Sequence, residues 1–194
     1  TLPLLGDDRL LANMMKDRKR VQRNENYKWI LDTVDKEQQM CRIVDAVVCL
    51  TEGTYQVLTD IYKIDKQKIF LIPNGLKKSD CIVTQTDKLK LRRKYYVDEN
   101  EKVILYVGRL SESKGADAVL EAFGILLNTF TNVRLVLAGG LLPDFDIANY
   151  ASISNKVTYT GHLSRRELKC WYQMADIGVA PSYTEQCSYV GIEM

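Results

Sequence analysis

Two carboxylates close to the end of the chain are the first candidates for chemistry. Glu185 and Glu193 lie eight positions apart, after a short apolar strand that ends at Pro181. Ser188 is a favoured helix N-cap, so we expect Glu185 in a turn and Glu193 just inside a new helix, leaning back towards that turn. Because a carboxylate can accept two hydrogen bonds from a vicinal diol, this spacing points to a sugar. The alternative is that Glu193 is only a favourable charge in a first helical turn.

The start of that helix is a second feature of the same segment. Its first amides have no intrahelical partner and carry partial positive charge, which suits a diphosphate. Ser188 and Tyr189 begin the helix and are therefore candidate nucleotide-binding residues. Together with the two carboxylates they predict a site that holds phosphates centrally, with a sugar and a ribose on either side.

A glycine turn followed by two basic residues is the other candidate site. The chain turns at Gly108, after an apolar run, and presents Arg109 and Lys114 just before a helix. Arg can bind two phosphate oxygens at once, and Lys adds a mobile positive charge. The turn is neither Gly-x-Gly-x-x-Gly nor Gly-x4-Gly-Lys-Ser/Thr, which argues against a dinucleotide site and excludes a P-loop. The alternative is a solvated helix entry.

The elements that would position these residues alternate along most of the chain. Predicted strands are 45–50, 68–72, 102–107, 133–138, 157–160 and 176–180, and predicted helices are 7–44, 52–62, 87–96, 116–129 and 164–174. This pattern predicts an α/β fold, a doubly wound parallel sheet with helices on both faces, plus part of a second α/β domain. Residues 73–75 predict a turn with Gly75 at positive φ. Ligands of such sheets bind at the carboxyl ends of strands, where the candidate residues lie.

The composition excludes several classes of protein. With 27 basic and 25 acidic residues the net charge is +2, so no nucleic-acid-binding surface is indicated. Five scattered cysteines and one histidine argue against a disulfide scaffold or a zinc site and favour a reducing cytosol. No apolar run is long enough to span a bilayer, and no signal peptide is visible. Because the chain starts at Thr1 and stops at Met194 inside a predicted helix, we expect part of a longer protein.

The motifs Val-Gly-Arg-Leu, Lys-Gly and Glu-x7-Glu together resemble the group 1 (family 4) retaining glycosyltransferases, which have the GT-B fold. Further matches are the strand 45–50 and the segments 72–75, 137–140 and 157–162, so the resemblance covers about 45–194. It implies that 1–75 is the C-terminal part of the N-terminal acceptor domain. Residues 76–194 would be most of the nucleotide-sugar donor domain, truncated at its C-terminus.

The resemblance also implies roles for the site residues. Arg109 and Lys114 would hold the donor diphosphate and neutralise the charge that grows on the leaving group, which is transition-state stabilisation. Glu185 would hold hydroxyls of the donor sugar and complete the catalytic set. The donor-binding set would be the ribose ligand Glu193, the nucleobase contacts His162 and Leu163, and Gly108, Gly139, Ser188 and Tyr189. We expect Gly139 and Gly140 to serve close packing or backbone approach rather than direct chemistry, with a phosphate or sugar contact as the alternative. We expect neither metal nor cofactor.

The resemblance implies a hexosyltransferase-type enzyme that moves a sugar from a nucleotide-diphosphate donor, a UDP-sugar by default, to a glycan, lipid-linked or protein acceptor. The segment alone is expected to bind donor without turnover. Alternatives are a sugar-nucleotide epimerase of the same fold, which the single histidine disfavours, a glycosidase, and a non-catalytic nucleotide-sugar-binding domain.

Two segments offer competing interpretations. Asp144 and Asp146 have the spacing of a manganese motif, but Pro143 precedes them and a helix cap is favoured. The basic helix 88–94 and the stretch 16–23 could contact the acceptor or anionic lipid at the inner membrane face, or could be solvated surfaces, which we favour. The expected location is cytoplasmic, with peripheral membrane association left open.

Overall fold

The computed structural model describes residues 25–77, 85–143, 145–183, 185 and 187–194. Its contacts divide the chain into two compact units: Thr1–Gly75 with Thr184–Cys187, and Leu76–Tyr183 with Ser188–Met194. The basic stretch 16–23 lies outside the described residues. Within the described part, no helix combines the length and the apolar character that crossing a bilayer requires.

The first unit packs helices on a short parallel strand pair. Its elements are α3 Glu25–Ile43, β1 Val47–Cys49, α4 Glu52–Gln56, the π-helix η1 Val57–Ile61, the 3-10 helix η2 Lys66–Lys68 and β2 Ile69–Leu71. Thr51 caps α4, since its hydroxyl accepts from the Thr54 amide at 3.2 Å. Tyr62 is buried in the core, and its hydroxyl donates to the Glu37 carboxylate at 2.6 Å.

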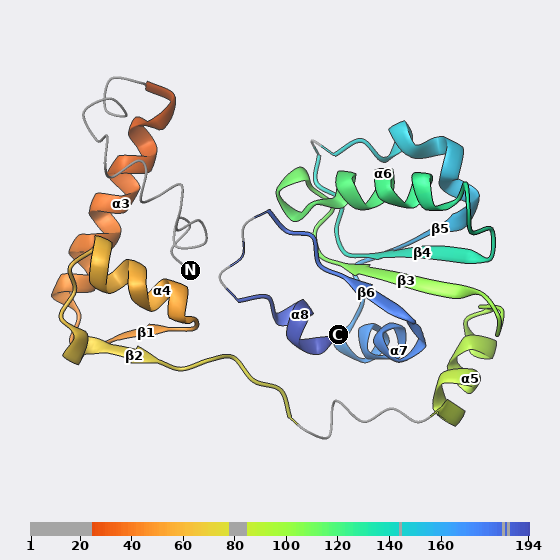
Figure 1. The fold of residues 1–194 in the computed structure, drawn as a ribbon, viewed down its shortest axis with the longest axis horizontal. Helices are drawn as coiled ribbons and strands as arrows, with labels where there is room; N and C mark the ends of the chain where they lie inside the picture. Colours follow the sequence, from red (N-terminus) through yellow and green to blue (C-terminus); the bar gives the residue numbers. More distant parts are fainter. Residues whose placement is uncertain (1–24, 78–84, 144, 184, 186) are drawn as a thin grey trace. The chain divides into compact units, whose positions relative to one another are not determined.

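The predicted turn at 73–75 is wrong. Residues 72–77 have no assigned turn, and Gly75 is absent from the glycines with positive φ. The segment instead runs on from β2 as irregular backbone (Figure 1). Ile72 still donates to the Cys49 carbonyl at 2.9 Å, which continues the pairing of β2 with β1, and among the described residues no backbone hydrogen bond closes a turn at 73–75.

The second unit is built on four parallel strands. These are β3 Lys102–Val107, β4 Val133–Ala138, β5 Val157–Gly161 and β6 Ile177–Val179, in the order β5-β4-β3-β6. The pairing of β3 with β4 runs over the full length of both strands, from Lys102 opposite Val133 to Val107 opposite Ala138. The predicted bounds of β3 and β4 are confirmed.

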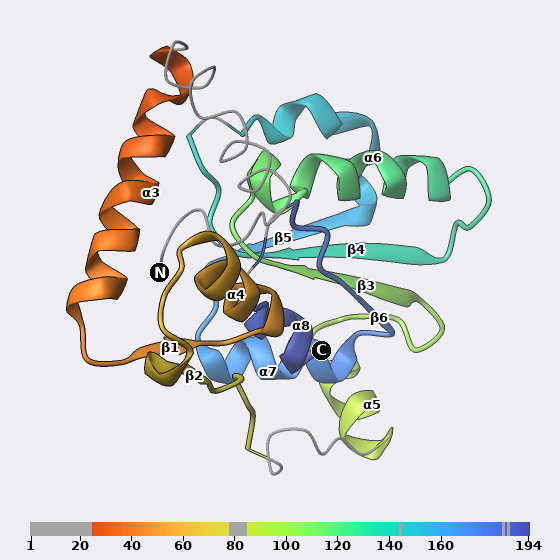
Figure 2. The same ribbon diagram turned by 60° about the vertical axis from the view of Figure 1, so that its left-hand side comes forward.

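Helices cover both faces of this sheet. Figure 1 shows α6 Ala116–Leu126 and the 3-10 helix η5 Ile147–Lys156 on one face, with α5 Gln85–Lys94 and α7 Arg165–Met174 on the other. The strands alternate accordingly: Tyr106 and Leu135 pack in the cluster under α6, whereas Leu105 and Val136 pack in the cluster that holds Trp171 of α7. The view in Figure 2 shows the same layers. The predicted fold class is confirmed.

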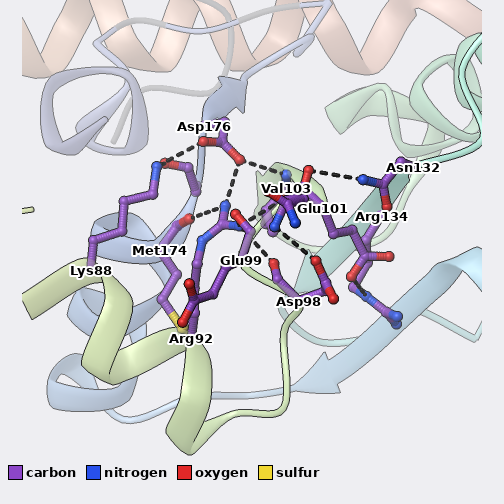
Figure 3. A network of polar contacts seen from close by, with 12 residues as sticks. Lys88, Arg92, Asp98, Glu99, Glu101, Val103, Asn132, Arg134, Met174 and Asp176 are labelled. Carbon is purple, nitrogen blue, oxygen red and sulfur yellow. Dashed lines mark hydrogen bonds and ion pairs between the residues drawn. The ribbon is translucent and has the colours of Figure 1, made fainter.

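A network of charged groups closes the amino end of the sheet (Figure 3). Arg92 of α5 is only 2% exposed and donates to the Asp176 carboxylate at 2.6 Å and to the Met174 carbonyl at 3.1 Å. It also donates to the carbonyls of Asp98, Glu99 and Glu101, which lie between α5 and β3. These acceptors replace the water that Arg92 loses, so its assignment to a solvated surface is wrong.

Asp176 joins three elements within that network. It accepts from Lys88 at 2.7 Å and from the Val103 amide at 2.8 Å, in addition to Arg92. Burial alone would raise the pKa of Asp176, but the hydrogen bonds from Lys88 and Val103 and the charge of Arg92 outweigh it and hold the pKa below its usual range. The carboxylate therefore stays charged and ties α5 to the starts of β3 and β6.

Candidate functional site

Backbone hydrogen bonds fix the loops at the carboxyl ends of β3, β4 and β5. The Gly108 amide donates to the last carbonyl of β4 at 2.9 Å, and the Gly139 amide donates to the Gly161 carbonyl at 3.0 Å. The pairing continues past the strands, since the Leu110 amide donates to the Gly140 carbonyl at 2.8 Å. The three loops therefore form one rigid edge.

Gly108 and Gly139 have backbone conformations at this edge that disfavour side chains. Their φ angles are +155° and +153°, which L side chains rarely adopt. A Cβ at Gly139 would overlap the Gly108 carbonyl oxygen, and one at Gly140 would overlap the His162 imidazole. The prediction of close packing or backbone approach therefore agrees with the backbone contact of Gly139 and with the packing of Gly140 against the His162 side chain. The edge itself presents backbone rather than side chains at these glycines.

An open cavity of about 240 Å³ lies on this floor. Five of the predicted site residues line it: Gly108, Arg109, Gly139, His162 and Leu163, together with Val107, Ala138, Gly140 and Leu168. The side chains of Arg109 and His162 are exposed, and no described residue hydrogen-bonds to or pairs with either of them. The cavity thus presents a guanidinium and an imidazole above a backbone surface, which suits a polar anion.

Tyr106 anchors the loop that carries both predicted phosphate ligands. It is 1% exposed, and its hydroxyl donates to the Arg109 carbonyl at 2.8 Å and lies 3.3 Å from the Lys114 carbonyl. Burial, with the Asp117 carboxylate as a smaller cause, raises the pKa of Tyr106 to about 12, so the hydroxyl keeps its proton. Lys114 is half-buried on the same loop and is not among the residues that line the cavity.

The loop after β3 is also packed on the segment after β6. The 3-10 helix η4 Glu112–Lys114 ends at Gly115, whose φ of +67° lies in the left-handed region. A Cβ at Gly115 would overlap the Pro181 carbonyl oxygen, and the Tyr183 amide donates to a carbonyl of η4 at 3.2 Å. The turn that bears Lys114 is therefore fixed to the strand end that precedes the predicted carboxylates.

Glu193 lies in a neighbouring pocket of the same unit. The helix α8 Tyr189–Glu193 begins after Ser188, whose hydroxyl accepts from the Gly191 amide at 3.0 Å, as predicted for its N-cap. The Glu193 carboxylate accepts from the Tyr172 hydroxyl at 2.8 Å. The pocket is lined by Leu76, Arg165, Leu168, Lys169, Tyr172 and Glu193. Because Leu168 lines both pockets, they are neighbours in the fold.

Glu185 and Tyr189 are not part of either pocket. Glu185 is exposed, and its segment Thr184–Cys187 is grouped with the first unit, so it is not among the residues that the second unit brings together. Tyr189 is exposed at the start of α8. Their assigned roles stay predictions.

Of the two aspartates with the spacing of a manganese motif, the structure describes only Asp146. Asp146 caps η5, since its carboxylate accepts from the Ala148 amide at 2.9 Å, which confirms the predicted cap. Asp144 lies outside the described residues. Across the part of the chain that the structure describes, no group of three or more His, Cys, Asp or Glu side chains could hold a metal ion.

Sequence reasoning missed the two tyrosines that contact the site residues. The sequence pattern places Tyr106 only in a strand and Tyr172 only in a helix. A usable signal exists for Tyr106, because a buried tyrosine hydroxyl requires a hydrogen-bond partner and this residue lies two positions before Gly108. Tyr172 gave no such signal, because its partner lies 21 positions away in another helix.

Comparison with known proteins identifies the family. A family model described as Glycosyl transferases group 1 matches residues 87–194, more than half of the chain. The chain therefore belongs to this family of glycosyltransferases, as its motifs predicted. An uncharacterized glycosyltransferase of Methanocaldococcus jannaschii is 30% identical over 152 residues, which are 76% of this chain and 39% of that relative.

Solved structures show the same fold. WaaG, a glycosyltransferase involved in lipopolysaccharide biosynthesis, has a TM-score of 0.73 at 18% identity, over 89% of this chain and 47% of its own. HepE of Anabaena, crystallised in complex with UDP-glucose, has a TM-score of 0.66 at 18% identity, over 84% of this chain and 45% of its own. The α/β architecture is that of GT-B glycosyltransferases, and the chain spans less than half of the length of these proteins.

Proposed function

We propose that the protein transfers a sugar from a nucleoside-diphosphate donor to an acceptor hydroxyl with retention, and that residues 76–194 carry the donor site. The observation that carries the proposal is the cavity at the carboxyl ends of the strands, where Arg109 and His162 flank a glycine backbone floor. A glycine floor lets phosphates approach the backbone, and an unpaired guanidinium can bind two phosphate oxygens.

The charge of Arg109 explains how the site would act on the reaction. As the bond between the sugar and the diphosphate breaks, negative charge grows on the leaving group. Arg109, with Lys114 on the same anchored loop, would stabilise this charge more strongly in the transition state than in the ground state. Because Tyr106 fixes the loop in advance, little reorganisation is needed when the charge develops.

Each of the remaining site residues would bind a different part of the donor. His162 and Leu163 would contact the nucleobase, Gly108 and Gly139 the phosphates, Ser188 and Tyr189 the donor near α8, and Glu193 the ribose. Glu185 would hold hydroxyls of the transferred sugar. UDP is the proposed nucleotide, supported by the complex of HepE with UDP-glucose. Residues 1–75 would belong to the acceptor domain, and a glycan, lipid-linked or protein acceptor would be bound largely outside this chain.

The family match favours transfer over the alternatives of epimerisation and glycoside hydrolysis. Membrane association through α5 is not supported, because most of its basic side chains are engaged. Lys88 and Arg92 bond to Asp176, Arg93 pairs with Glu99, and Lys94 lies over the Tyr95 ring.

Calorimetry with UDP, GDP and ADP tests the proposal. One of the three should bind, and Arg109→Ala should weaken that binding about tenfold or more, since it removes charge-assisted hydrogen bonds to phosphate. Arg93→Ala is the matched control, because it removes an exposed arginine from α5 and should leave affinity unchanged. Absence of binding by all three nucleotides, or equal binding by Arg109→Ala, would contradict the proposal.

A further inference from the structure

The hydrogen bond between Tyr172 and Glu193 joins two helices of different length. Tyr172 lies on α7, a helix of ten residues with a capping box between Ser164 and Glu167 at its start and with Trp171 in the core. Glu193 is the last residue of α8, a helix of five residues. A glutamate has several rotatable side-chain bonds, so its carboxylate needs an outside contact to hold one position.

The tyrosine is suited to be that contact. Its hydroxyl lies 2.8 Å from Glu193 Oε2 in a partly buried position. Burial and the adjacent Glu193 carboxylate raise the pKa of Tyr172, so the hydroxyl remains a donor throughout the physiological range. Hydrogen bonds to a charged acceptor are stronger than neutral ones, which favours a single carboxylate orientation.

The same contact leaves the second carboxylate oxygen available. No described residue other than Tyr172 bonds to the Glu193 carboxylate, so Oε1 can accept from a ligand. Leu168, one turn before Tyr172 on α7, lines both this pocket and the cavity with Arg109. A ligand whose phosphates lie at Arg109 therefore has a hydroxyl acceptor in the adjoining pocket.

We propose that Tyr172 is a positioning residue that holds Glu193 for recognition of the ribose hydroxyls of the nucleoside diphosphate. This inference rests on the proposed function and adds a residue that acts through Glu193 rather than on the ligand. It differs from a purely structural tie between α7 and α8, which would stabilise the fold without affecting the choice of sugar.

The test compares the nucleoside diphosphate that binds best with its 2′-deoxy and 3′-deoxy analogues. The unmodified protein should prefer the ribonucleotide over at least one analogue. Tyr172→Phe should weaken ribonucleotide binding by about tenfold, the size expected for a hydrogen bond to a charged group, and should weaken analogue binding less. The ratio of the two affinities should therefore fall towards one. An undiminished ratio would overturn the proposal, whatever the effect on stability.

A double-mutant cycle gives a second, independent readout. Glu193→Ala removes the carboxylate that the Tyr172 hydroxyl holds, so adding Tyr172→Phe to it should cost little further affinity, because the hydrogen bond between the two side chains is already lost. Additive losses would contradict the proposal. Tyr159→Phe removes the hydroxyl of another partly exposed tyrosine on β5, and it should change neither affinity nor the ratio.

The result separates this inference from the function on which it rests. If the unmodified protein binds no nucleoside diphosphate, the proposed function and the inference both fail. If it binds with a ribose preference that Tyr172→Phe preserves, only the inference fails.

Discussion

The two ends of the parallel sheet in the second unit use charged residues in opposite ways. At the amino end, Arg92, Lys88 and Asp176 bond to one another and to backbone groups. At the carboxyl end, the loops are held by backbone hydrogen bonds and by the hydroxyl of Tyr106. There the guanidinium of Arg109 has no protein partner within the described residues.

This difference indicates that the two ends of the sheet have different roles. A buried charge must be compensated by partners, and the amino-end network provides them, so its charges contribute to stability rather than to binding. The carboxyl end is stabilised by glycine packing and neutral hydrogen bonds, which leaves charge available for a ligand. Mutations at the amino end should therefore lower stability without changing nucleotide affinity, whereas mutations at the carboxyl end should change affinity as well.

The largest expected effect is on stability, at the amino end. Arg92→Met should lower the free energy of unfolding by about 3–5 kcal/mol, because it removes a buried charge-assisted donor from the Asp176 carboxylate and from the four backbone carbonyls that Arg92 bonds to. Urea unfolding measures the loss, and nucleotide affinity of the folded fraction should be unchanged. Arg93→Met is the control: this side chain is 71% exposed, and losing its ion pair should cost less than about 1 kcal/mol. Equal losses in the two variants would remove the distinction between the ends.

The next largest effect is expected at the carboxyl end, on both the free energy of unfolding and nucleotide affinity. Gly139→Ala places a Cβ against the Gly108 carbonyl at a φ of +153°, so the two loops must separate. We expect a loss of roughly 2–4 kcal/mol in unfolding free energy and loss of measurable nucleotide binding.

Gly124→Ala is the matched control for that substitution. Gly124 lies inside α6, and the nearest atom to a Cβ there is the Ile153 side chain at 3.9 Å. Alanine should stabilise the helix by up to about 1 kcal/mol and leave nucleotide affinity unchanged. A Gly139→Ala variant that behaved like Gly124→Ala would show that the close approach has no role in the site.

The carboxyl end was largely predictable from sequence, for a physical reason. Its features are local: Gly108 and Arg109 follow an apolar strand, and Ser188 caps the helix that ends with Glu193. Local backbone preferences and parallel-strand topology suffice to bring Gly108, Gly139 and His162 to one edge.

The amino end was not predictable, because its contacts are long-range. Arg92 and Asp176 are 84 positions apart, and nothing around either residue indicates the other. Arg92 lies in a run of basic residues, which led to its assignment to a solvated surface. The partner of Glu193 was missed for the same reason, since the spacing of Glu185 and Glu193 indicates a ligand but not Tyr172.

The smallest effect is the sharpest test of how the carboxyl end is held. Tyr106→Phe removes only a hydroxyl, so it should lower the free energy of unfolding by about 1 kcal/mol and weaken binding of the nucleoside diphosphate about three- to tenfold. Binding of the nucleoside monophosphate should change less, because the loop that carries Arg109 and Lys114 is expected to contact mainly the diphosphate. Tyr62→Phe is a demanding control, since it removes a buried, hydrogen-bonded hydroxyl from the first unit. It should lower stability at least as much without changing affinity. If both variants changed affinity in proportion to stability, Tyr106 would be only a core residue, and the rigidity of the loop would have to come from its backbone hydrogen bonds alone.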